Sequence, residues 1–410
     1  MATLRDIEIS DRKREESVAI LVGPNGSGKS TFLRALAESY RHENVIAVSN
    51  TPHDRFARMR GIRRISAGRP DHTPPNIVKR ALARSLDADD SSFHQISAIM
   101  GYCGYAPRFG FLIKKAKHYG SSFDDLRWNL DGASSATADE QMTWDSDPEH
   151  DEQLRRALAF LSRHDPGEFV WIDATGSVFE FSLAREFVVV LRCEAILRRL
   201  EVIGPIEVML QRNDPYLTVI EMHLASSGQL ALISSLLFLI TEAGSSAIIL
   251  VDEPENSLHP SWQRAYVDNL MAAMTYRDAT IVVATHAPLV VTGALSEAPD
   301  KVSVFRMQGG KPARLQIDTS AEPSSIEEIL WKAFEVVTPA NHFVSEEIID
   351  AISRFEEDKI DKKEVLRLIN AFEKHSFEDK QRRFFDAVRK LVEKVERTKA
   401  SIDGGEDGFA

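Results

Sequence analysis

Residues 20–32 read Ile-Leu-Val-Gly-Pro-Asn-Gly-Ser-Gly-Lys-Ser-Thr-Phe, and this stretch decides the fold of the chain. It fits a buried strand, a glycine turn and the start of a helix. Gly23, Gly28, Lys29 and Ser30 match the spacing G-x-x-x-x-G-K-[ST]. In such a phosphate-binding loop (P-loop), glycines let backbone N–H groups point at phosphate oxygens, and the helix start adds a positive dipole end. The stretch therefore predicts a nucleotide site.

The spacing also assigns roles within the loop. Lys29 supplies a point charge for the β and γ phosphates, and the Ser30 hydroxyl is a ligand for Mg²⁺. A glycine turn with an accidental lysine is the alternative, but the apolar run 18–22 supplies the strand that the motif requires. We expect ATP and Mg²⁺ as cofactors. The expected nucleotide-binding residues here are Asn25, Gly26, Ser27, Gly28, Lys29, Ser30 and Thr31.

The composition is that of a globular chain of 410 residues, with 43% hydrophobic and 27% charged residues. Its net charge of −12 argues against nucleic-acid binding over the whole surface. Cys103 and Cys193 form no C-x-x-C pattern, so we expect reduced thiols. No apolar segment opens the chain, and the most apolar stretch, 230–240, is about half a membrane span. We expect a cytoplasmic protein with no membrane contact.

Apolar periodicity divides the rest of the chain into strands and helices, which predicts an α/β fold. Residues 101–107 suggest a loop, and residues 121–151 an exposed insertion. The expected strands are a weak edge strand at 4–10 and strands at 44–50, 206–210, 217–222, 247–253, 279–286, 302–307 and 313–317. The expected helices are 29–41, 154–161, 181–200, a helix ending at 240, 261–274, and a charged helical region beyond 323.

A carboxylate pair follows the apolar strand that ends at residue 251. Such a strand is buried on both faces, and its end is expected beside the P-loop. Asp252 is then a Mg²⁺ ligand together with Ser30, and Glu253 is the residue that orients or deprotonates the attacking water. His286 ends the next strand and is a candidate contact for the γ-phosphate. A polar strand end and a structural histidine are the simpler alternatives.

The tetrad Ser226, Ser227, Gly228 and Gln229 precedes a long apolar helix. Taken alone, it fits an ordinary helix N-cap. An exposed helix start with a hydroxyl also binds phosphate. It lies too far along the fold to reach its own P-loop, so we expect it to act on the nucleotide of a second copy in a head-to-tail homodimer.

The order of P-loop, Ser-Ser-Gly-Gln, Asp-Glu and histidine resembles that of an ATP-binding-cassette (ABC) ATPase. The wording Glu255-Asn-Ser-Leu-His259-Pro260 resembles the non-transporter branch, which includes overcoming-lysogenisation-defect (OLD) nucleases and RecF-like and SMC-like ATPases of the AAA type. Ser227 stands where a glycine is more usual, and only Gln95 and Asn50 are candidates for the Q-loop. The resemblance implies a P-loop NTPase, ABC-type head with an inserted, mainly helical region and a C-terminal helical domain.

The expected boundaries are a head over 1–320 with an insertion at about 55–200, a helical domain over 321–400 and a tail over 401–410. Many members of this branch carry a Toprim nuclease, but the last ninety or so residues show no strand-borne acidic cluster. The layout is similar to the ATPase subunit of Septu anti-phage systems, which pairs with a separate HNH nuclease. The resemblance thus implies a slow ATPase that controls an effector nuclease through its C-terminal helices.

Two other functions stay open at this point. Residues 55–84 hold nine Arg or Lys residues against only Asp71 and the preceding Asp54, which fits either a solvated face balanced by acids or a nucleic-acid contact. A DNA-repair or chromosome-type ATPase that clamps DNA directly is therefore the second hypothesis. An ATP-regulated toxin with its own effector activity is the third.

Overall fold

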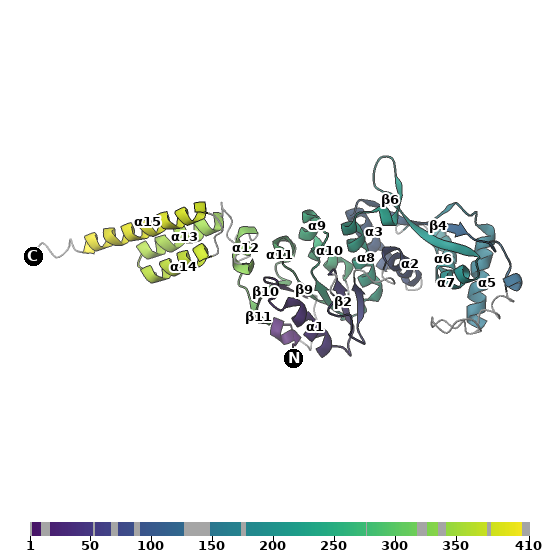
Figure 1. Cartoon of the computed structure of the whole chain (residues 1–410), viewed down its shortest axis with the longest axis horizontal. Coiled ribbons are helices and arrows are strands. Elements are labelled where there is room, and N and C mark those ends of the chain that lie inside the picture. The colour runs from purple at the N-terminus through teal and green to yellow at the C-terminus, as the bar shows by residue number, and fades with distance from the viewer. Residues whose placement is uncertain are drawn as a thin grey trace, which may run out of the picture.

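A computed structural model of the chain describes residues 2–9, 17–51, 54–66, 73–85, 91–126, 148–173, 178–275, 277–317, 326–334, 342–374 and 379–403. Its larger sheet has seven strands in the order β11-β10-β1-β9-β8-β2-β3, all parallel except β11 (Figure 1). These strands are β1 Ser17–Val22, β2 Val45–Ser49, β3 Arg63–Ser66, β8 Ile248–Asp252, β9 Thr280–Ala284, β10 Val302–Gln308 and β11 Lys311–Arg314.

The central strand β1 is apolar throughout because both faces of the sheet are covered. Ala19 and Leu21 pack with Phe32 and Leu33 of helix α1 Lys29–Ser39. Val18, Ile20 and Val22 belong to the core on the opposite face, which includes residues of α8 Ser227–Glu242, α10 Tyr266–Ala273 and α11 Pro288–Glu297. The alternation of side chains along a strand thus fixes which helix each strand residue contacts.

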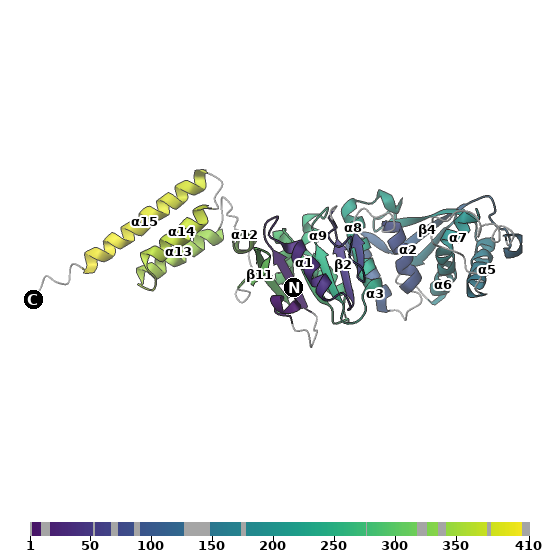
Figure 2. The ribbon, with the colours of Figure 1, turned by 60° about the horizontal axis from the view of Figure 1, so that its bottom comes forward.

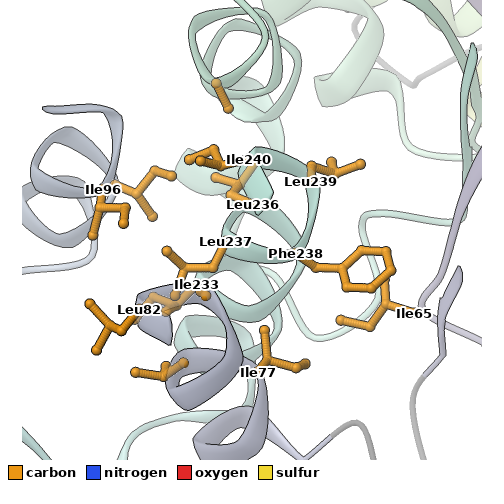
Figure 3. Packing of buried hydrophobic residues seen from close by; sticks show 14 of the residues in the cluster. Ile65, Ile77, Leu82, Ile96, Ile233, Leu236, Leu237, Phe238, Leu239 and Ile240 are labelled. Carbon is orange, nitrogen blue, oxygen red and sulfur yellow. The ribbon is translucent and has the colours of Figure 1, made fainter. Parts of the chain in front are cut away.

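Helix α8 is buried along most of its length. Its residues Ile233, Leu237 and Phe238 pack against Ile65, Ile77, Leu82 and Ile96 of β3, α2 Pro74–Ser85 and α3 Ser91–Tyr102 (Figure 3). Apolar side chains surround this helix, which explains why its sequence is hydrophobic on every side. The prediction of a core helix rather than a membrane segment agrees with this packing.

A second, four-stranded antiparallel sheet lies at the end of the molecule away from the C-terminal helices (Figure 2). Its order is β5-β4-β6-β7, and its buried face packs with helices of the same region. The strands are β4 Tyr105–Lys115, β5 Phe169–Asp173, β6 Ile203–Arg212 and β7 Val219–Glu221. The helices are α5 Pro148–Arg163, α6 Val178–Arg192 and α7 Glu194–Arg199.

The C-terminal part is helical in the residues that the structure describes, as predicted. Helix α12 packs Ile329 and Ala333 into the main core, while its Trp331 ring lies 4.3 Å from the ring of Phe372. It therefore joins the head to a separate three-helix cluster (Figure 1). The bounds are α12 Ile326–Phe334, α13 His342–Glu356, α14 Lys362–Lys374 and α15 Asp379–Asp403.

The predicted fold class, an α/β P-loop NTPase with an added helical region, is confirmed. The insertion has other limits than 55–200: β3 belongs to the main sheet, and β6 and β7 complete the second sheet. Residues 127–147, most of the insertion predicted at 121–151, lie outside the described residues.

Three local predictions were wrong. Leu4–Ile7 is a 3-10 helix (η1), not a strand, because Thr3 and Asp6 form a capping box around it. The loop predicted at 101–107 already contains the start of β4. The helix predicted at 261–274 is two helices, α9 Pro260–Arg264 and α10, separated at Ala265.

Candidate nucleotide site

The P-loop runs from the end of β1 to the start of α1. Gly28 caps α1 with φ = 99°, a left-handed conformation that favours glycine. A Cβ atom at Gly28 would lie 2.9 Å from Cα of Gly310 in the β10–β11 turn, and the N–H of Gly310 donates to the Ser27 carbonyl at 3.2 Å. The loop is therefore shaped by its own glycines and by a hairpin turn packed on it.

Lys29 lies folded back onto this loop. Its Nζ donates to the carbonyls of Gly23 at 2.7 Å and Pro24 at 3.2 Å. Burial lowers the pKa of Lys29, and the charges of Glu253, Glu255 and Asp252 oppose that shift. A buried ammonium group surrounded by carbonyls and carboxylates can exchange its carbonyl partners for phosphate oxygens without leaving the site.

Ser30 and Asp252 meet although they are far apart in the sequence. The Ser30 hydroxyl donates to Oδ1 of Asp252 at 2.9 Å, and Asp252 is 1% exposed at the end of β8. Burial raises the pKa of Asp252 to about 6. Among the described residues no group of three or more His, Cys, Asp or Glu suits a metal ion. A hydroxyl beside one buried carboxylate fits Mg²⁺ when phosphate oxygens supply further ligands.

A pocket of about 210 Å³ opens over these residues. Among the predicted residues, its lining includes Lys29, Ser30 and Glu253. Arg55 also lines it, although the sequence placed Arg55 only in a basic cluster. The full lining is Asn25, Gly26, Gly28, Lys29, Ser30, Thr31, Arg55 and Glu253. Ser27, also predicted as a binding residue, is not among the residues given for the pocket lining, and its buried hydroxyl has no hydrogen-bond partner among the described residues.

Glu253 adopts φ = 52°, which is rare for a residue with a side chain. Its N–H donates to the Ala284 carbonyl at 2.9 Å, and its Oε2 accepts from Nδ2 of Asn256 at 3.1 Å. The neighbouring strand and the following turn therefore fix both its backbone and its carboxylate. The carboxylate of Glu253 is held at the pocket in a defined position.

His286 follows β9, next to β8 in the sheet, but it is absent from the pocket lining. Its Nδ1 lies 2.9 Å from Oε1 of Glu255. Asn50, a Q-loop candidate, bonds through its N–H to the Asp252 carbonyl at 3.2 Å, so it lies at the same strand ends. The other candidate, Gln95, lies in α3 and is not part of the pocket.

The tetrad 226–229 is not part of this pocket either. Ser226 and Gln229 cap α8 reciprocally, and Gln229 also donates to the Cys103 carbonyl at 2.9 Å. Gly228 has a packing role, because a Cβ atom there would lie 2.3 Å from the Ser257 carbonyl. Ser226 and Ser227 are exposed. The simpler N-cap interpretation thus accounts for much of the tetrad, and the two serines remain available to an external group.

The basic region 55–84 is balanced in part by acids, which favours one of the two interpretations. Lys79 pairs with Glu194 at 2.8 Å and Arg64 with Asp54 at 3.7 Å. Arg63 and Arg84 both pair with Glu242. Within the described residues, Arg58 and Arg60 are exposed on the same stretch. Three acids thus pair with four of the nine basic residues of the region, and Arg55 is exposed as well.

Two further observations concern the cysteines and the apolar helices. Cys103 and Cys193 are free and buried, and burial raises their pKa values to about 12 and about 11. Both thiols are therefore protonated and poorly reactive at neutral pH. Among the described helices, none combines the length and apolar character needed to span a bilayer.

Two family models match adjoining parts of the chain. A model described as "ABC transporter" matches residues 8–101. A model described as "AAA domain, putative AbiEii toxin, Type IV TA system" matches residues 111–292. The chain matches no curated protein.

Three solved structures show some similarity to the chain at low sequence identity. An ATP-binding cassette of an ABC transporter in its ADP conformation is 13% identical, with 77% of this chain and 84% of that chain covered at a TM-score of 0.27. An SmcHead bound to the C-winged helix domain of ScpA is 13% identical, with 75% and 92% covered at a TM-score of 0.26. VirB4 of Thermoanaerobacter pseudethanolicus is 10% identical, with 74% and 90% covered at a TM-score of 0.24.

These TM-scores are too low to bear on function. The two family models, together with the joined Ser30 and Asp252, support an ABC-type P-loop ATPase domain in this chain.

Proposed function

We propose that the chain binds Mg²⁺-ATP at the P-loop pocket and hydrolyses it. The observation that carries this proposal is the hydrogen bond between Ser30 and Asp252, with Lys29 and Glu253 lining the same pocket. A hydroxyl, a carboxylate, an ammonium group and a second carboxylate are the groups that P-loop hydrolysis requires. Ser30 and Asp252 are 222 residues apart in the chain, so it is the fold that brings these groups together.

In this proposal each residue has a separate task. Lys29 leaves the Gly23 and Pro24 carbonyls and binds the β and γ phosphates. Ser30 and Asp252 hold Mg²⁺, which neutralises charge on the phosphates when bound. Glu253 accepts a hydrogen bond from the attacking water, and Asn256 keeps its carboxylate in place. Arg55 adds a positive charge on the pocket wall.

The second part of the proposal is a head-to-tail homodimer. Ser226 and Ser227 are exposed at the start of a sixteen-residue helix, and they do not line the pocket of their own chain. Exposed hydroxyls at a long helix start suit a phosphate of another copy. The N-cap geometry also suits an isolated chain, and substitutions of the two serines distinguish a helix cap from a dimer interface.

The third part is control of a separate effector, such as an HNH nuclease in anti-phage defence. Helix α12 supports it, because its residues bury into the head and contact the C-terminal helices. The β10–β11 turn contacts the P-loop, and helix α11 contacts both β10 and α12. A change in the P-loop thus has a short route to the C-terminal helices.

An ATP-regulated toxin is the competing function, because the description of the family model that matches residues 111–292 includes the words "putative AbiEii toxin". Direct clamping of DNA has less support, since four of the nine basic residues of region 55–84 are paired with acids and the chain as a whole is acidic. Phosphate release from ATP by the purified chain, with and without Mg²⁺, tests the ATPase. We expect Mg²⁺-dependent release, and none in the presence of a chelator. No release under any condition contradicts the proposal.

Expression in cells separates the two modes of action. An ATPase that controls a partner is expected to be harmless alone and to retain a nuclease in a pull-down. A chain that stops growth by itself and retains no partner is a toxin.

A further inference from the structure

A buried carboxylate that the proposed mechanism does not use lies beside His286. Glu255 follows β8 in the turn that leads to α9, and its side chain is 5% exposed. One of its oxygens, Oε1, lies 2.7 Å from the backbone nitrogen of His286 and 2.9 Å from Nδ1 of the same residue. The sequence indicated Glu255 only as the first residue of a loop motif. The structure gives it a specific partner.

This geometry bears on which imidazole nitrogen carries a proton. An ionised carboxylate only accepts hydrogen bonds, so the close contact requires a proton on Nδ1. Nε2 is then left to face other groups, and the His286 side chain is 43% exposed while that of Glu255 is almost fully buried. The backbone contact to the same oxygen fixes the ring relative to β9. One residue, Glu255, thus contacts both the backbone and the ring of His286.

The burial of Glu255 favours a role beyond packing. Its Oε2 is buried and has no hydrogen-bond partner among the described residues. Leaving a buried carboxylate oxygen unpaired costs free energy, which a purely structural residue could avoid by being apolar. The positive groups near this carboxylate are Lys29, whose pKa it helps to raise, and His286 when that ring is protonated. Glu255 thus lies between the phosphate-binding lysine and the histidine.

We propose that Glu255 is a positioning residue that holds His286 with Nδ1 protonated and Nε2 free to contact the γ-phosphate or its attacking water. The inference deepens the proposed ATPase function and rests on it for its catalytic consequence. A neutral ring offers Nε2 as an acceptor to water. A ring that has gained a second proton offers Nε2–H as a donor to phosphate, and Glu255 then stabilises the added charge.

The tautomer is measured directly by long-range ¹H–¹⁵N NMR of the full chain with ¹⁵N-labelled histidine side chains. His286→Gln assigns the resonance. We expect a protonated Nδ1 at His286 in the wild-type chain. We expect Glu255→Leu, which removes the acceptor at similar volume, to lose this preference, and Glu255→Gln, which keeps one acceptor oxygen, to restore part of it.

The exposed pair of Glu221 and His223, 3.2 Å apart, supplies the matched control. Glu221→Gln is expected to leave the His286 resonances and ATP turnover unchanged. An unprotonated Nδ1 at wild-type His286 overturns the proposal even if Glu255→Leu fails to fold. The same protonation state in wild type and folded Glu255→Leu also overturns it.

Kinetics supply the second readout. Removing the partner of a functional histidine typically costs about tenfold or more. We expect Glu255→Leu to lower kcat by about that factor with ATP affinity nearly unchanged, and to have no further effect in a His286→Gln background. Additive losses contradict the proposal. A wild-type chain that hydrolyses no ATP contradicts the proposed function instead, and the NMR result still decides the role of Glu255.

Discussion

The P-loop pocket and the start of helix α8 are the two places at which we propose that the chain binds phosphate, and the two differ in how complete they are. At the pocket, Ser30 and Asp252 contact each other directly, and Lys29 and Glu253 lie beside them. At the start of α8, the tetrad bonds to its own neighbours: Ser226 to Gln229, and Gln229 to Tyr105. The side chains at the P-loop meet at one pocket, whereas the start of α8 is a capped helix end with exposed hydroxyls.

This difference separates the residues of each motif that have a sufficient structural reason to be present from those that do not. Burying Asp252 raises its pKa and costs free energy, and nothing in packing explains a carboxylate there. Gly228, in contrast, is required by the nearby Ser257 carbonyl whether or not a nucleotide ever arrives. In the tetrad, therefore, the serines carry the functional hypothesis, while Gly228 and Gln229 have sufficient structural reasons to be present.

The largest expected effect is at the pocket. Lys29→Ala removes the only ammonium group in the pocket lining and is expected to weaken ATP binding by about a hundredfold or more. Isothermal titration with a non-hydrolysable ATP analogue measures it. Lys301→Ala, on the surface between α11 and β10, is the matched control and is expected to bind normally. If Lys29→Ala bound the analogue with wild-type affinity, the P-loop would not be the ATP site.

A smaller effect is expected at Glu253, because it acts on the water rather than on ATP. Glu253→Gln keeps the shape and the contact with Asn256, so binding is expected to stay within a few-fold of wild type. Turnover is expected to fall by about 10²–10⁴-fold, the typical contribution of a general base. Single-turnover phosphate release measures it. Hydrolysis by Glu253→Gln at the wild-type rate would show that another group positions the water.

The start of α8 is tested by Ser226→Arg and Ser227→Arg. Both insert a long cation into an expected interface, so hydrolysis is expected to fall while ATP binding by the single chain persists. Ser226→Arg also loses a helix cap, which costs about 1 kcal/mol of stability. Ser227 has no such cap role, and its variant therefore isolates the interface. Unchanged turnover in a folded Ser227→Arg contradicts the head-to-tail dimer.

The smallest effect is expected at the basic region. Arg58→Glu with Arg60→Glu changes two exposed residues that form no ion pair within the described part of the chain, and we expect ATP turnover within twofold of wild type. DNA binding, measured against salt concentration, is expected to be weak in both proteins. Steeply salt-dependent binding that this double variant loses would restore the DNA-clamping hypothesis.

The central strands of the main sheet could be predicted from the sequence because they are short, almost wholly apolar and followed by polar residues, whereas β3, with two arginines, was not predicted. Strands β1, β2, β8 and β9 all fit that description. The second sheet was harder to predict. Strand β4 carries polar and basic residues such as Arg108 and Lys114 on its outer face, and these resemble a surface cluster rather than a strand. Its partner β5 was not among the predicted strands.

Side-chain contacts between distant segments account for the rest. Motif spacing gave Ser30 and Asp252 as partners, but no spacing connects Glu255 to His286 or Arg55 to the pocket. These depend on the order of strands in the sheet, which places the ends of β8 and β9 side by side. The same order explains why Gln95, in α3, was an unsuitable Q-loop candidate, whereas Asn50 lies at the end of β2.

Mixing two inactive variants tests the central claim most directly, namely that each chain holds one half of an ATP site. Lys29→Ala has a defective pocket and an intact helix start, and Ser227→Arg has the reverse. If the second half comes from another copy, an equimolar mixture regains ATP turnover at about a quarter of the wild-type rate, because half of the dimers are mixed and each holds one intact site of two. A mixture no faster than the sum of its parts, or full activity of Ser227→Arg alone, contradicts the claim.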